Sequence, residues 1–319
     1  MKIAFFSEAG YQGKVSRDNP NMRTDMAWVC ALNAEHYPLS LISKISDKAY
    51  DLGIAILPKK KEPWLNINVA SELQRVSKVC AIQQESHHTQ WQDNPVEHQI
   101  WYLNNLSQVD FMFVHNNIDV EYYSGLINKE CEKMPSLMIT DFIKTSQEPK
   151  ADAVMIGGNL VSIYRGIDSF MVAREYELPI YALSSGRKPD REEELGINHL
   201  PWMLWSDWIY NLSKFKYAVQ FGIGAAGSFN LNCAYLGIPC IGLKALETQN
   251  LCFPDLSIGD VDLKKGKKLA HKLKEDKDFY NHCVQQGQEN YKKHFAEEKF
   301  LTTVNNIFKK HYSIKYGSL

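Results

Sequence analysis

Short apolar runs of strand length alternate along the chain with longer stretches that carry apolar residues at helical spacing. In the first part of the sequence such runs cover 2–7, 39–45, 51–57, 78–83, 110–115 and 136–140. Stretches with helical spacing lie between them, near 24–32, 68–76, 95–107 and 119–128. Because strands alternate with helices, the pattern predicts a parallel sheet with right-handed crossover connections.

A polar segment over residues 145–151 interrupts this alternation, and we expect a domain boundary there. A second alternating series follows, with strands expected at 153–156, 179–183, 217–221 and 239–243 and helices at 168–176, 206–214 and 229–235. From about residue 260 the pattern is helical. The sequence therefore predicts an α/β fold with an N-terminal domain over 1–148, a second domain over 149–285 and a terminal helix over 286–319.

Composition narrows the class of protein. The 319 residues carry 36 Lys and Arg against 37 Asp and Glu, and 45% of them are hydrophobic, which excludes a disordered chain and a strong overall attraction to polyanions. No stretch approaches the roughly 18 apolar residues of a membrane-spanning helix, and no secretory signal is evident. Seven scattered cysteines indicate reduced thiols. We expect a cytoplasmic protein without a membrane span.

The most informative motif is a glycine-rich turn that joins the strand expected at 217–221 to a helix expected to begin at Ser228. Backbone N–H groups at a helix start form a site for anions, and small residues let a phosphate approach the backbone closely. A tight turn with nothing bound is the alternative interpretation. The spacing matches neither the G-x-G-x-x-G fingerprint nor a P-loop, so it gives no support to dinucleotide or ATP binding.

The pair Gly227-Ser228, followed by Asn232 and by Leu-Gly-Ile-Pro239, resembles the C-terminal nucleotide-sugar motif of GT-B glycosyltransferases and of non-hydrolysing nucleotide-sugar epimerases. In those families a Gly-Ser or Gly-Thr turn holds the diphosphate, and an acidic residue shortly after it binds the ribose hydroxyls. Asn232 stands at the acidic position here, so its ribose contact would lack the strength of a charged hydrogen bond.

A second segment extends the resemblance. Gly157, Gly158 and Arg165 follow the first strand of the second domain and look like the corresponding turn of a bacteriophage DNA β-glucosyltransferase, another GT-B enzyme. The resemblance implies that Arg165 neutralises the diphosphate as it leaves, a task that suits the fork of a guanidinium. A surface arginine that caps a loop is the alternative. The segment around Met203 corresponds to the base pocket of the family, and its tryptophans either stack on a base or anchor the next helix.

The first domain should bind the acceptor and supply a base. Inverting glycosyl transfer needs a carboxylate or histidine within reach of the acceptor hydroxyl. By resemblance to the phage enzyme Glu85 is the first candidate, with Asp93 and His87 next. Solvated loop carboxylates are the alternative for each. We expect the loop after the first strand, with Gly10, Gly13 and Asp18, to lie on the acceptor side.

No metal or cofactor is expected. His87 and His88 are adjacent, which points their side chains in different directions, and no spacing typical of a metal site accompanies them. GT-B enzymes generally need no bound metal for their chemistry, so the resemblance implies a metal-independent enzyme. The nucleotide-sugar, with UDP as the expected nucleotide, would act as a co-substrate.

The resemblance implies two Rossmann-like domains with a cleft between them and C-terminal helices that cross back to the first domain. It implies an enzyme that transfers a sugar from a UDP-sugar to an acceptor hydroxyl. The hydroxymethylated base of phage DNA is one acceptor to consider, and a glycan or small molecule is the other. A nucleotide-sugar 2-epimerase and a non-catalytic two-lobed sugar-binding protein remain as alternatives. Sequence leaves open whether transfer inverts or retains the anomeric configuration, and it leaves the oligomeric state open.

Overall fold

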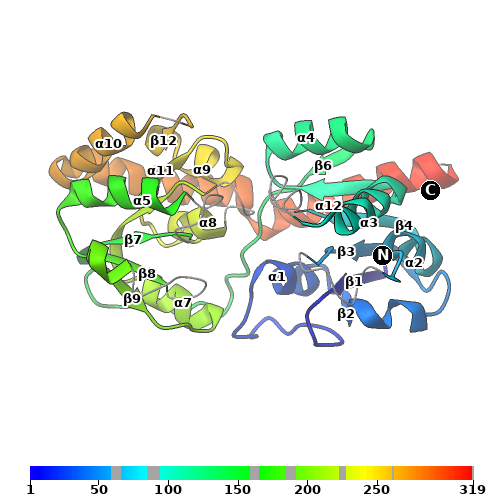
Figure 1. Ribbon diagram of the computed structural model, residues 1–319. Coiled ribbons are helices and arrows are strands. Elements are labelled where there is room, and N and C mark those ends of the chain that lie inside the picture. The colour runs from blue at the N-terminus through cyan, green and yellow to red at the C-terminus, as the bar shows by residue number, and fades with distance from the viewer. Residues whose placement is uncertain are drawn as a thin grey trace. The chain divides into compact units, whose positions relative to one another are not determined.

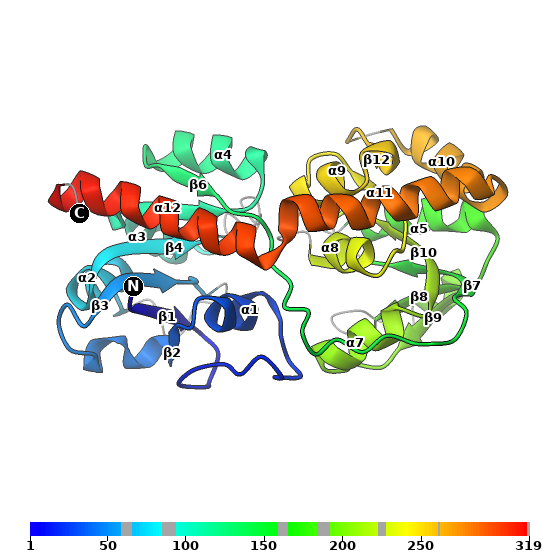
Figure 2. The ribbon, with the colours of Figure 1, turned by 180° about the vertical axis from the view of Figure 1, so that it is seen from behind.

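The computed structural model describes residues 1–58, 66–84, 94–158, 165–183, 192–222, 228–260 and 262–317. The chain forms two compact units (Figures 1 and 2). The first unit consists of Met1–Asn19, Arg23–Ile139 and Glu297–Leu319, and the second of Pro20–Met22 and Thr140–Ala296. Among the described residues, no helix is both long enough and apolar enough to cross a membrane.

The first unit contains a six-stranded parallel sheet in the order β2-β1-β3-β4-β5-β6. The strands are β1 (Ile3–Ser7), β2 (Glu35–Pro38), β3 (Tyr50–Ala55), β4 (Ser77–Gln83), β5 (Phe111–Val114) and β6 (Cys131–Lys133). The helices are α1 (Thr24–Ala31), α2 (Val69–Val76), α3 (Val96–Gln108), α4 (Asn117–Ile127) and α12 (Glu297–Tyr316). The strand order reverses between β1 and β3, which makes this pair the switch point of the sheet.

Two strand predictions, over 39–45 and 136–140, are wrong. The run over 39–45 forms a 3-10 helix, η1 (Leu39–Lys44), and the edge strand β2 precedes it. A three-residue helical period places Leu39 and Ile42 on one buried face, so the same apolar residues suit this helix as well as a strand. The run over 136–140 is buried but pairs with no strand of the described sheets.

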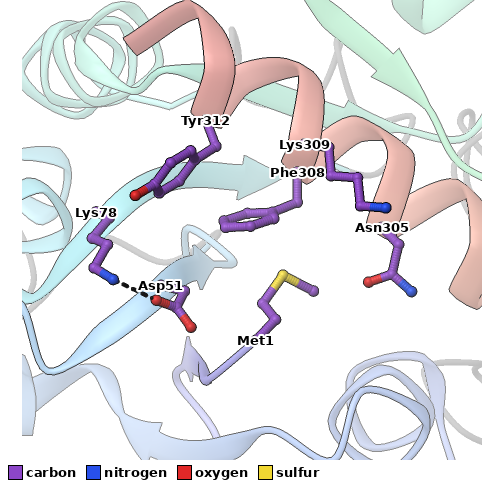
Figure 3. A pocket seen from close by; sticks show the side chains of 7 residues that line it. All are labelled: Met1, Asp51, Lys78, Asn305, Phe308, Lys309 and Tyr312. Atoms are coloured by element: carbon purple, nitrogen blue, oxygen red, sulfur yellow. Dashed lines mark hydrogen bonds and ion pairs between the residues drawn. The ribbon is translucent and has the colours of Figure 1, made fainter. Parts of the chain in front are cut away.

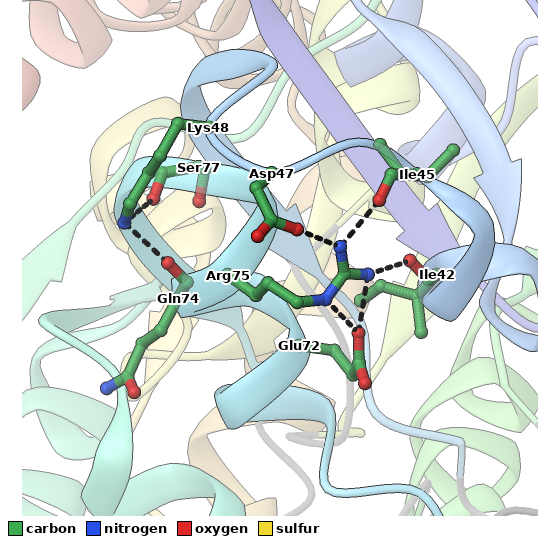
Figure 4. A network of polar contacts seen from close by, with 8 residues as sticks. All are labelled: Ile42, Ile45, Asp47, Lys48, Glu72, Gln74, Arg75 and Ser77. Carbon is green, nitrogen blue, oxygen red and sulfur yellow. Dashed lines mark hydrogen bonds and ion pairs between the residues drawn. The ribbon is translucent and has the colours of Figure 1, made fainter.

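Arg75 of α2 fixes η1 to the first unit (Figure 4). Its guanidinium donates to the carbonyl oxygens of Ile42 and Ile45 at 2.9 and 2.6 Å. It also pairs with Asp47 and Glu72, at 2.6 and 2.7 Å. Five N–H donors in a planar fork let one side chain satisfy carbonyls and carboxylates together, which the single ammonium of a lysine could not do.

The C-terminal helix belongs to the core of the first unit, as expected from the sequence. Phe300 of α12 is fully buried, and its ring meets the edge of the fully buried Trp28 of α1 at 4.8 Å between centroids. Trp28 in turn contacts Phe113 of β5 at 5.4 Å. The helix therefore adds apolar area to this core, a favourable term of about 25 cal/mol per Å² removed from water.

The second unit also contains a six-stranded parallel sheet, in the order β12-β11-β10-β7-β8-β9. The strands are β7 (Ala151–Ile156), β8 (Ile180–Leu183), β9 (Ile197–Leu200), β10 (Phe215–Gln220), β11 (Cys240–Leu243) and β12 (Ser257–Ile258). The helices are α5 (Gly166–Ala173), α7 (Trp205–Leu212), α8 (Ser228–Tyr235), α9 (Glu247–Cys252), α10 (Leu263–Glu275) and α11 (Lys277–Phe295). The order reverses between β7 and β10, as in a dinucleotide-binding sheet.

Lys150, directly before β7, ties the sheet to the end of α8. Its ammonium donates to the carbonyl oxygens of Leu236 and Gly237 at 2.8 and 2.5 Å. These carbonyls follow the last turn of the helix, where cations are favourable because of the helix dipole. Burial of the side chain nevertheless lowers the pKa of Lys150 to about 8.

All seven cysteines are free thiols, and six of them are buried. Burial raises the pKa of Cys80 and of Cys252 to about 12, so neither thiol is a ready nucleophile near neutral pH. This agrees with the reduced cysteines expected from the sequence.

Candidate functional site

The strongest candidate site of the second unit lies at the carboxyl ends of β7 and β10, the switch point of the sheet, where open α/β sheets bind ligands. Gly157 follows β7 directly, and its N–H donates to the carbonyl of Val219 at 3.0 Å. A Cβ at this position would lie 2.8 Å from Phe229 Cδ1 and 2.9 Å from Gln220 Cδ. Only glycine fits here, because Phe229 and Gln220 pack directly against its Cα.

Three buried side chains near this end of the sheet hold oxygen atoms that no described residue pairs with. They are Gln220 Oε1 at the end of β10, Asn230 Oδ1 in the first turn of α8 and Thr248 Oγ1 in the first turn of α9. Exposed fractions of these side chains are 5%, 0% and 1%. An unpaired buried acceptor costs about 1–3 kcal/mol, so the arrangement favours a bound group that donates hydrogen bonds.

The amide of Asn230 is held in place by its neighbours. Its Nδ2 donates to Gln249 Oε1 at 2.7 Å, and Gln249 Nε2 donates to the carbonyl of Cys240 at 2.9 Å. This chain of hydrogen bonds fixes which side of the Asn230 amide is the free acceptor. Sequence reasoning missed Gln220, Asn230, Thr248 and Gln249. The available signal was a polar residue directly after, or inside, an otherwise apolar run.

Of the glycine-rich turn predicted to bind an anion, the structure describes the helix start at Ser228. Ser228 is the first residue of α8 and is exposed, as an anion site at a helix start requires. Gly227 lies outside the described residues. Asn232 is 5% exposed on the second turn of α8, and no described residue pairs with its side-chain amide. The amide group therefore remains available for a hydroxyl.

Arg165 has a left-handed backbone conformation, with φ of 45°, at the N-cap of α5. Its Nε donates to Asp168 Oδ2 at 2.7 Å, and its Nη1 pairs with Asp260 after β12. The arginine side chain is 20% exposed, whereas Asp260 is 77% exposed. Asp168 holds the guanidinium from within α5, while the exposed Asp260 is the partner that an anion can replace at lower cost. Gly158, with φ of +74°, precedes this segment.

Met203 lies between β9 and α7, where its Sδ is 3.5 Å from Asn211 Nδ2. Of the nearby tryptophans, Trp202 is 57% exposed, whereas Trp208 is partly buried and stacks on Phe229 at 6.2 Å between ring centroids. Since Phe229 also lies against the position of Gly157, Trp208 supports the wall of the candidate site. It acts as an anchor for α7, one of the two roles expected.

In the first unit a cavity of about 170 Å³ opens at the carboxyl ends of β1, β3 and β4. Gln83 and Gln84 line it together with Tyr102, whose hydroxyl donates to Gln84 Oε1 at 2.6 Å. Gln83 is 1% exposed and its Oε1 has no partner among the described residues. Glu8 lies at the same cavity. The switch point of the first sheet thus also offers polar atoms to a ligand.

The loop after β1 is fixed by His36 of β2. Nδ1 of His36 is 2.7 Å from the carbonyl oxygen of Tyr11, and Nε2 is 2.8 Å from Ser7 Oγ. The Tyr11 ring stacks on the imidazole at 3.8 Å, and Gly13 exchanges two backbone hydrogen bonds with His36, at 2.8 and 2.9 Å. Gly13 has φ of +106°, a conformation that favours glycine.

The other residues expected in the first domain have different outcomes. Gly10 is exposed in the loop that His36 fixes. Asp18 is exposed and accepts a hydrogen bond from Ser16 Oγ. Glu85, His87 and Asp93, the three predicted catalytic residues, lie outside the described residues.

One group in the described part of the chain has metal-ligand geometry: Glu130, Glu132 and His311. Lys310 Nζ pairs with both carboxylates, at 2.9 and 2.8 Å, and therefore occupies the place a cation would take. His311 Nε2 is 2.7 Å from Glu132, and its ring stacks on Phe111. The group is best explained as an ion-pair cluster that fastens α12 to β6.

The chain resembles solved glycosyltransferase structures in fold. The match to Anabaena HepE, solved with UDP and glucose, includes 97% of this chain and 100% of the HepE chain, with a TM-score of 0.67 and 11% identity. An alpha-glucosyltransferase solved with UDP and DNA containing an HMU base covers 97% of this chain and 99% of its own, with a TM-score of 0.64 and 11% identity. S. aureus TarM matches 84% of this chain with a TM-score of 0.63 and 10% identity.

These similarities establish the GT-B fold expected from the sequence, with two Rossmann-like sheets. No family model and no curated protein matches the chain. The matched region is 57% of the TarM chain and 59% of the pneumococcal GtfA chain, so this protein spans less than two thirds of either. HepE and the alpha-glucosyltransferase are matched over nearly their whole length.

Proposed function

We propose that the protein is a glycosyltransferase that moves a sugar from UDP-sugar to an acceptor hydroxyl. The observation that carries this proposal is the carboxyl edge of the second sheet. There Gly157 lets Phe229 and Gln220 pack directly against the end of β7, and the buried oxygens of Gln220, Asn230 and Thr248 have no partner among the described residues. A nucleotide-sugar supplies many hydroxyl and N–H donors. HepE and the alpha-glucosyltransferase, which share the fold, were solved with UDP.

In this proposal the second unit binds the donor. The start of α8 at Ser228, with the adjacent Gly227, holds a phosphate, and Asn232 hydrogen-bonds a ribose hydroxyl. Arg165 exchanges its exposed partner Asp260 for a diphosphate oxygen while Asp168 keeps the guanidinium oriented. A preorganised donor opposite the leaving diphosphate stabilises the charge that develops there, an effect worth about 3–4 kcal/mol for a single donor in other enzymes.

The first unit binds the acceptor in this proposal. Gln84 lines its cavity at the carboxyl ends of β1, β3 and β4. The candidate bases Glu85, His87 and Asp93 follow Gln84 in the sequence. If transfer inverts the anomeric centre, one of them takes the proton of the acceptor hydroxyl. If transfer retains it, these residues position the acceptor. The anomeric configuration of the product, read from its proton NMR coupling constant, distinguishes the two.

A thermal-shift series with UDP, GDP and TDP tests donor binding. Ligand bound to the folded state at 100 times its Kd stabilises it by about 2.7 kcal/mol, so UDP at millimolar concentration should raise Tm by several degrees. Gln220→Leu should weaken UDP binding at least tenfold, whereas Gln285→Leu, on the exposed face of α11, should leave it unchanged. No stabilisation by any of the three nucleotides would overturn the proposal.

The role of Arg165 has its own test. Arg165→Lys keeps the charge but loses the fork, and we expect it to lower kcat more than it changes the Kd of UDP-glucose. Asp260→Asn removes the exposed competitor for the guanidinium and should tighten UDP binding. An unchanged kcat in Arg165→Lys would exclude the arginine from the leaving-group step.

Acceptor identity requires direct assay. The alpha-glucosyltransferase of similar fold was solved with DNA containing an HMU base, so DNA is one acceptor class to test, and a glycan is the other. Binding to hydroxymethylated duplex DNA should weaken steeply with salt if DNA is the acceptor. Incubation with UDP-sugar alone distinguishes a 2-epimerase, since an epimer formed without acceptor would contradict the transferase. Activity retained in EDTA would establish metal independence.

A further inference from the structure

A second cavity, of about 340 Å³, lies at the amino end of the first sheet, the opposite edge from the candidate acceptor site. Asp51 and Lys78 are the second residues of β3 and β4, and Met1 precedes β1. On the other side α12 contributes Asn305, Phe308, Lys309 and Tyr312. The volume falls in the range of about 300–1,000 Å³ that small-molecule sites occupy.

The four residues of α12 recur at spacings of three and four, which places them on one face of the helix. Figure 3 shows the rings of Phe308 and Tyr312 projecting from this face toward the strands, with the Met1 side chain opposite Phe308. The two ring centroids lie 5.6 Å apart with their planes at 48°. Both rings are partly buried, so each keeps an accessible surface in the cavity.

The polar groups of the cavity are mixed in kind. Asp51 Oδ1 accepts from Lys78 Nζ at 2.8 Å, and Asp51 Oδ2 accepts from the backbone N–H of Lys2 at 2.7 Å. No described residue pairs with the side chain of Asn305 or Lys309. The cavity thus offers a carboxylate, two ammonium groups and an amide around an aromatic surface.

These groups together suit one chemical class. A sugar ring has apolar C–H faces that pack on aromatic rings and hydroxyls that both donate and accept hydrogen bonds. Among the lining side chains Asp51 pairs with Lys78, and Lys309 has no carboxylate partner in the described residues. A single-stranded nucleic acid would instead require a continuous positive groove beside its stacking surface.

We propose that this cavity is a second carbohydrate-binding site, which holds one or two uncharged hexopyranose units by stacking on Phe308 and Tyr312. Asn305 and Asp51 hydrogen-bond the ring hydroxyls. The site lies at the amino edge of its sheet and is separate from the proposed transfer site. If the acceptor is a glycan, binding a distant unit of it here raises the effective concentration of acceptor at the enzyme.

The Met1 methyl group is a reporter placed inside the cavity. In protein labelled with ¹³C-methyl methionine, we would titrate glucose, N-acetylglucosamine and maltose and follow the Met1 signal, with the buried Met26 as internal reference. The expected result is a saturable shift of Met1 at millimolar sugar. Tighter binding of maltose than of glucose would indicate an oligosaccharide source, and equal affinity a free monosaccharide.

Variants separate binding from folding. Phe308→Ala should weaken sugar binding at least tenfold. Asn305→Leu, at an exposed position where folding is not at risk, should weaken it severalfold. Tyr210→Leu removes an exposed tyrosine of α7 in the second unit and serves as the matched control. A thermal melt of each variant verifies that it is folded.

Three outcomes would overturn the proposal: no saturable Met1 shift with any sugar up to 50 mM, a shift that persists unchanged in Asn305→Leu, or binding of a thymidine decanucleotide in place of sugars. Measurement of UDP affinity in the same samples separates the two proposals. If the protein binds UDP but no sugar, only the second-site proposal is contradicted. If it binds sugar at the second site but no UDP, only the transferase proposal is contradicted.

Discussion

The hydroxyl of Ser7 donates a hydrogen bond to Nε2 of His36 across 2.8 Å. The direction follows from the other ring nitrogen, because Nδ1 lies 2.7 Å from a carbonyl oxygen of Tyr11, which can only accept. In the neutral ring Nε2 is therefore the acceptor. Ser7 Oγ also receives the N–H of Ala9 at 3.2 Å. One buried imidazole thus closes the loop between β1 and Gly13.

We predict that His36→Phe keeps the stack with Tyr11 but loosens this loop. Both hydrogen bonds of the imidazole are lost, and Ser7 is left without its acceptor. The free energy of unfolding should fall by about 1–3 kcal/mol. Transfer activity should fall by about tenfold to a hundredfold, because a misplaced loop disturbs the reacting geometry. UDP affinity should not change. His282→Phe, at an exposed position of α11, is the control.

The same residue predicts a pH effect. Burial is the main cause that lowers the pKa of His36, so the folded protein binds its proton less readily than the unfolded chain. The stability contribution is complete above the ordinary histidine pKa of about 6.5 and decreases as the pH falls below it. Urea unfolding at pH 5 and pH 7 should give a larger difference for the wild type than for His36→Phe. Equal differences would contradict a neutral buried His36.

Gly157→Ala should damage the proposed donor site. The added Cβ would lie within 3 Å of Phe229 and Gln220, so one of these side chains must move. We expect a stability loss of about 1–3 kcal/mol and UDP binding at least tenfold weaker. Gly125→Ala is the matched change, since nothing lies within 4 Å of a Cβ there, and it should be neutral or stabilising by up to about 1 kcal/mol. Isothermal titration with UDP compares the two variants.

The ion pairs of Glu132 with α12 should make the free energy of unfolding depend on pH in the acid range. The hydrogen bond from His311, and then that from Lys310, lowers the pKa of the Glu132 carboxyl. A carboxyl with a lowered folded-state pKa stabilises the protein above its ordinary pKa of about 4.5 and loses this contribution as the pH falls through the folded-state value. Glu132→Gln should therefore be less stable than the wild type at pH 7, and the gap should close below pH 4. Glu121→Gln, exposed on α4, should show no such gap.

Lys150 predicts a gain in stability of the same sign, but at alkaline pH. Because burial lowers its pKa to about 8, the folded protein releases this proton before the unfolded chain does at about 10.5. The free energy of unfolding of the wild type should therefore rise relative to Lys150→Met, by up to about 3 kcal/mol, as the pH increases from 8 to 10.5. Denaturant melts of both proteins at several pH values measure the difference. A constant difference would contradict the lowered pKa.

The sequence predicted the central strands well. Strands buried on both faces of a parallel sheet read as short apolar runs, and for this reason β1 and β4 were expected within a residue of where they lie. Edge strands carry too few apolar residues for such a signal. The two-residue β12 and the short β9 were missed, and β2 was hidden behind the apolar run that forms η1.

For the site, sequence patterns located the strand ends but not the polar atoms gathered there. Glycine-rich turns marked Gly157 and Ser228 because glycine has a local meaning that can be read without a structure. Whether a glutamine such as Gln220 is buried, or lacks a partner, depends on packing between distant segments. The bond between Ser7 and His36 joins residues 29 positions apart and has no sequence signature.

The first unit is discontinuous in sequence, since α12 joins it only after the whole of Thr140–Ala296 has been made. During synthesis on the ribosome the second unit can therefore complete its fold while the Trp28 surface that Phe300 covers is still exposed. A chaperone that recognises apolar surface would find its target in the half of the protein that is translated first. The emergence of α12 from the ribosome would then set the time at which the N-terminal sheet acquires its native stability.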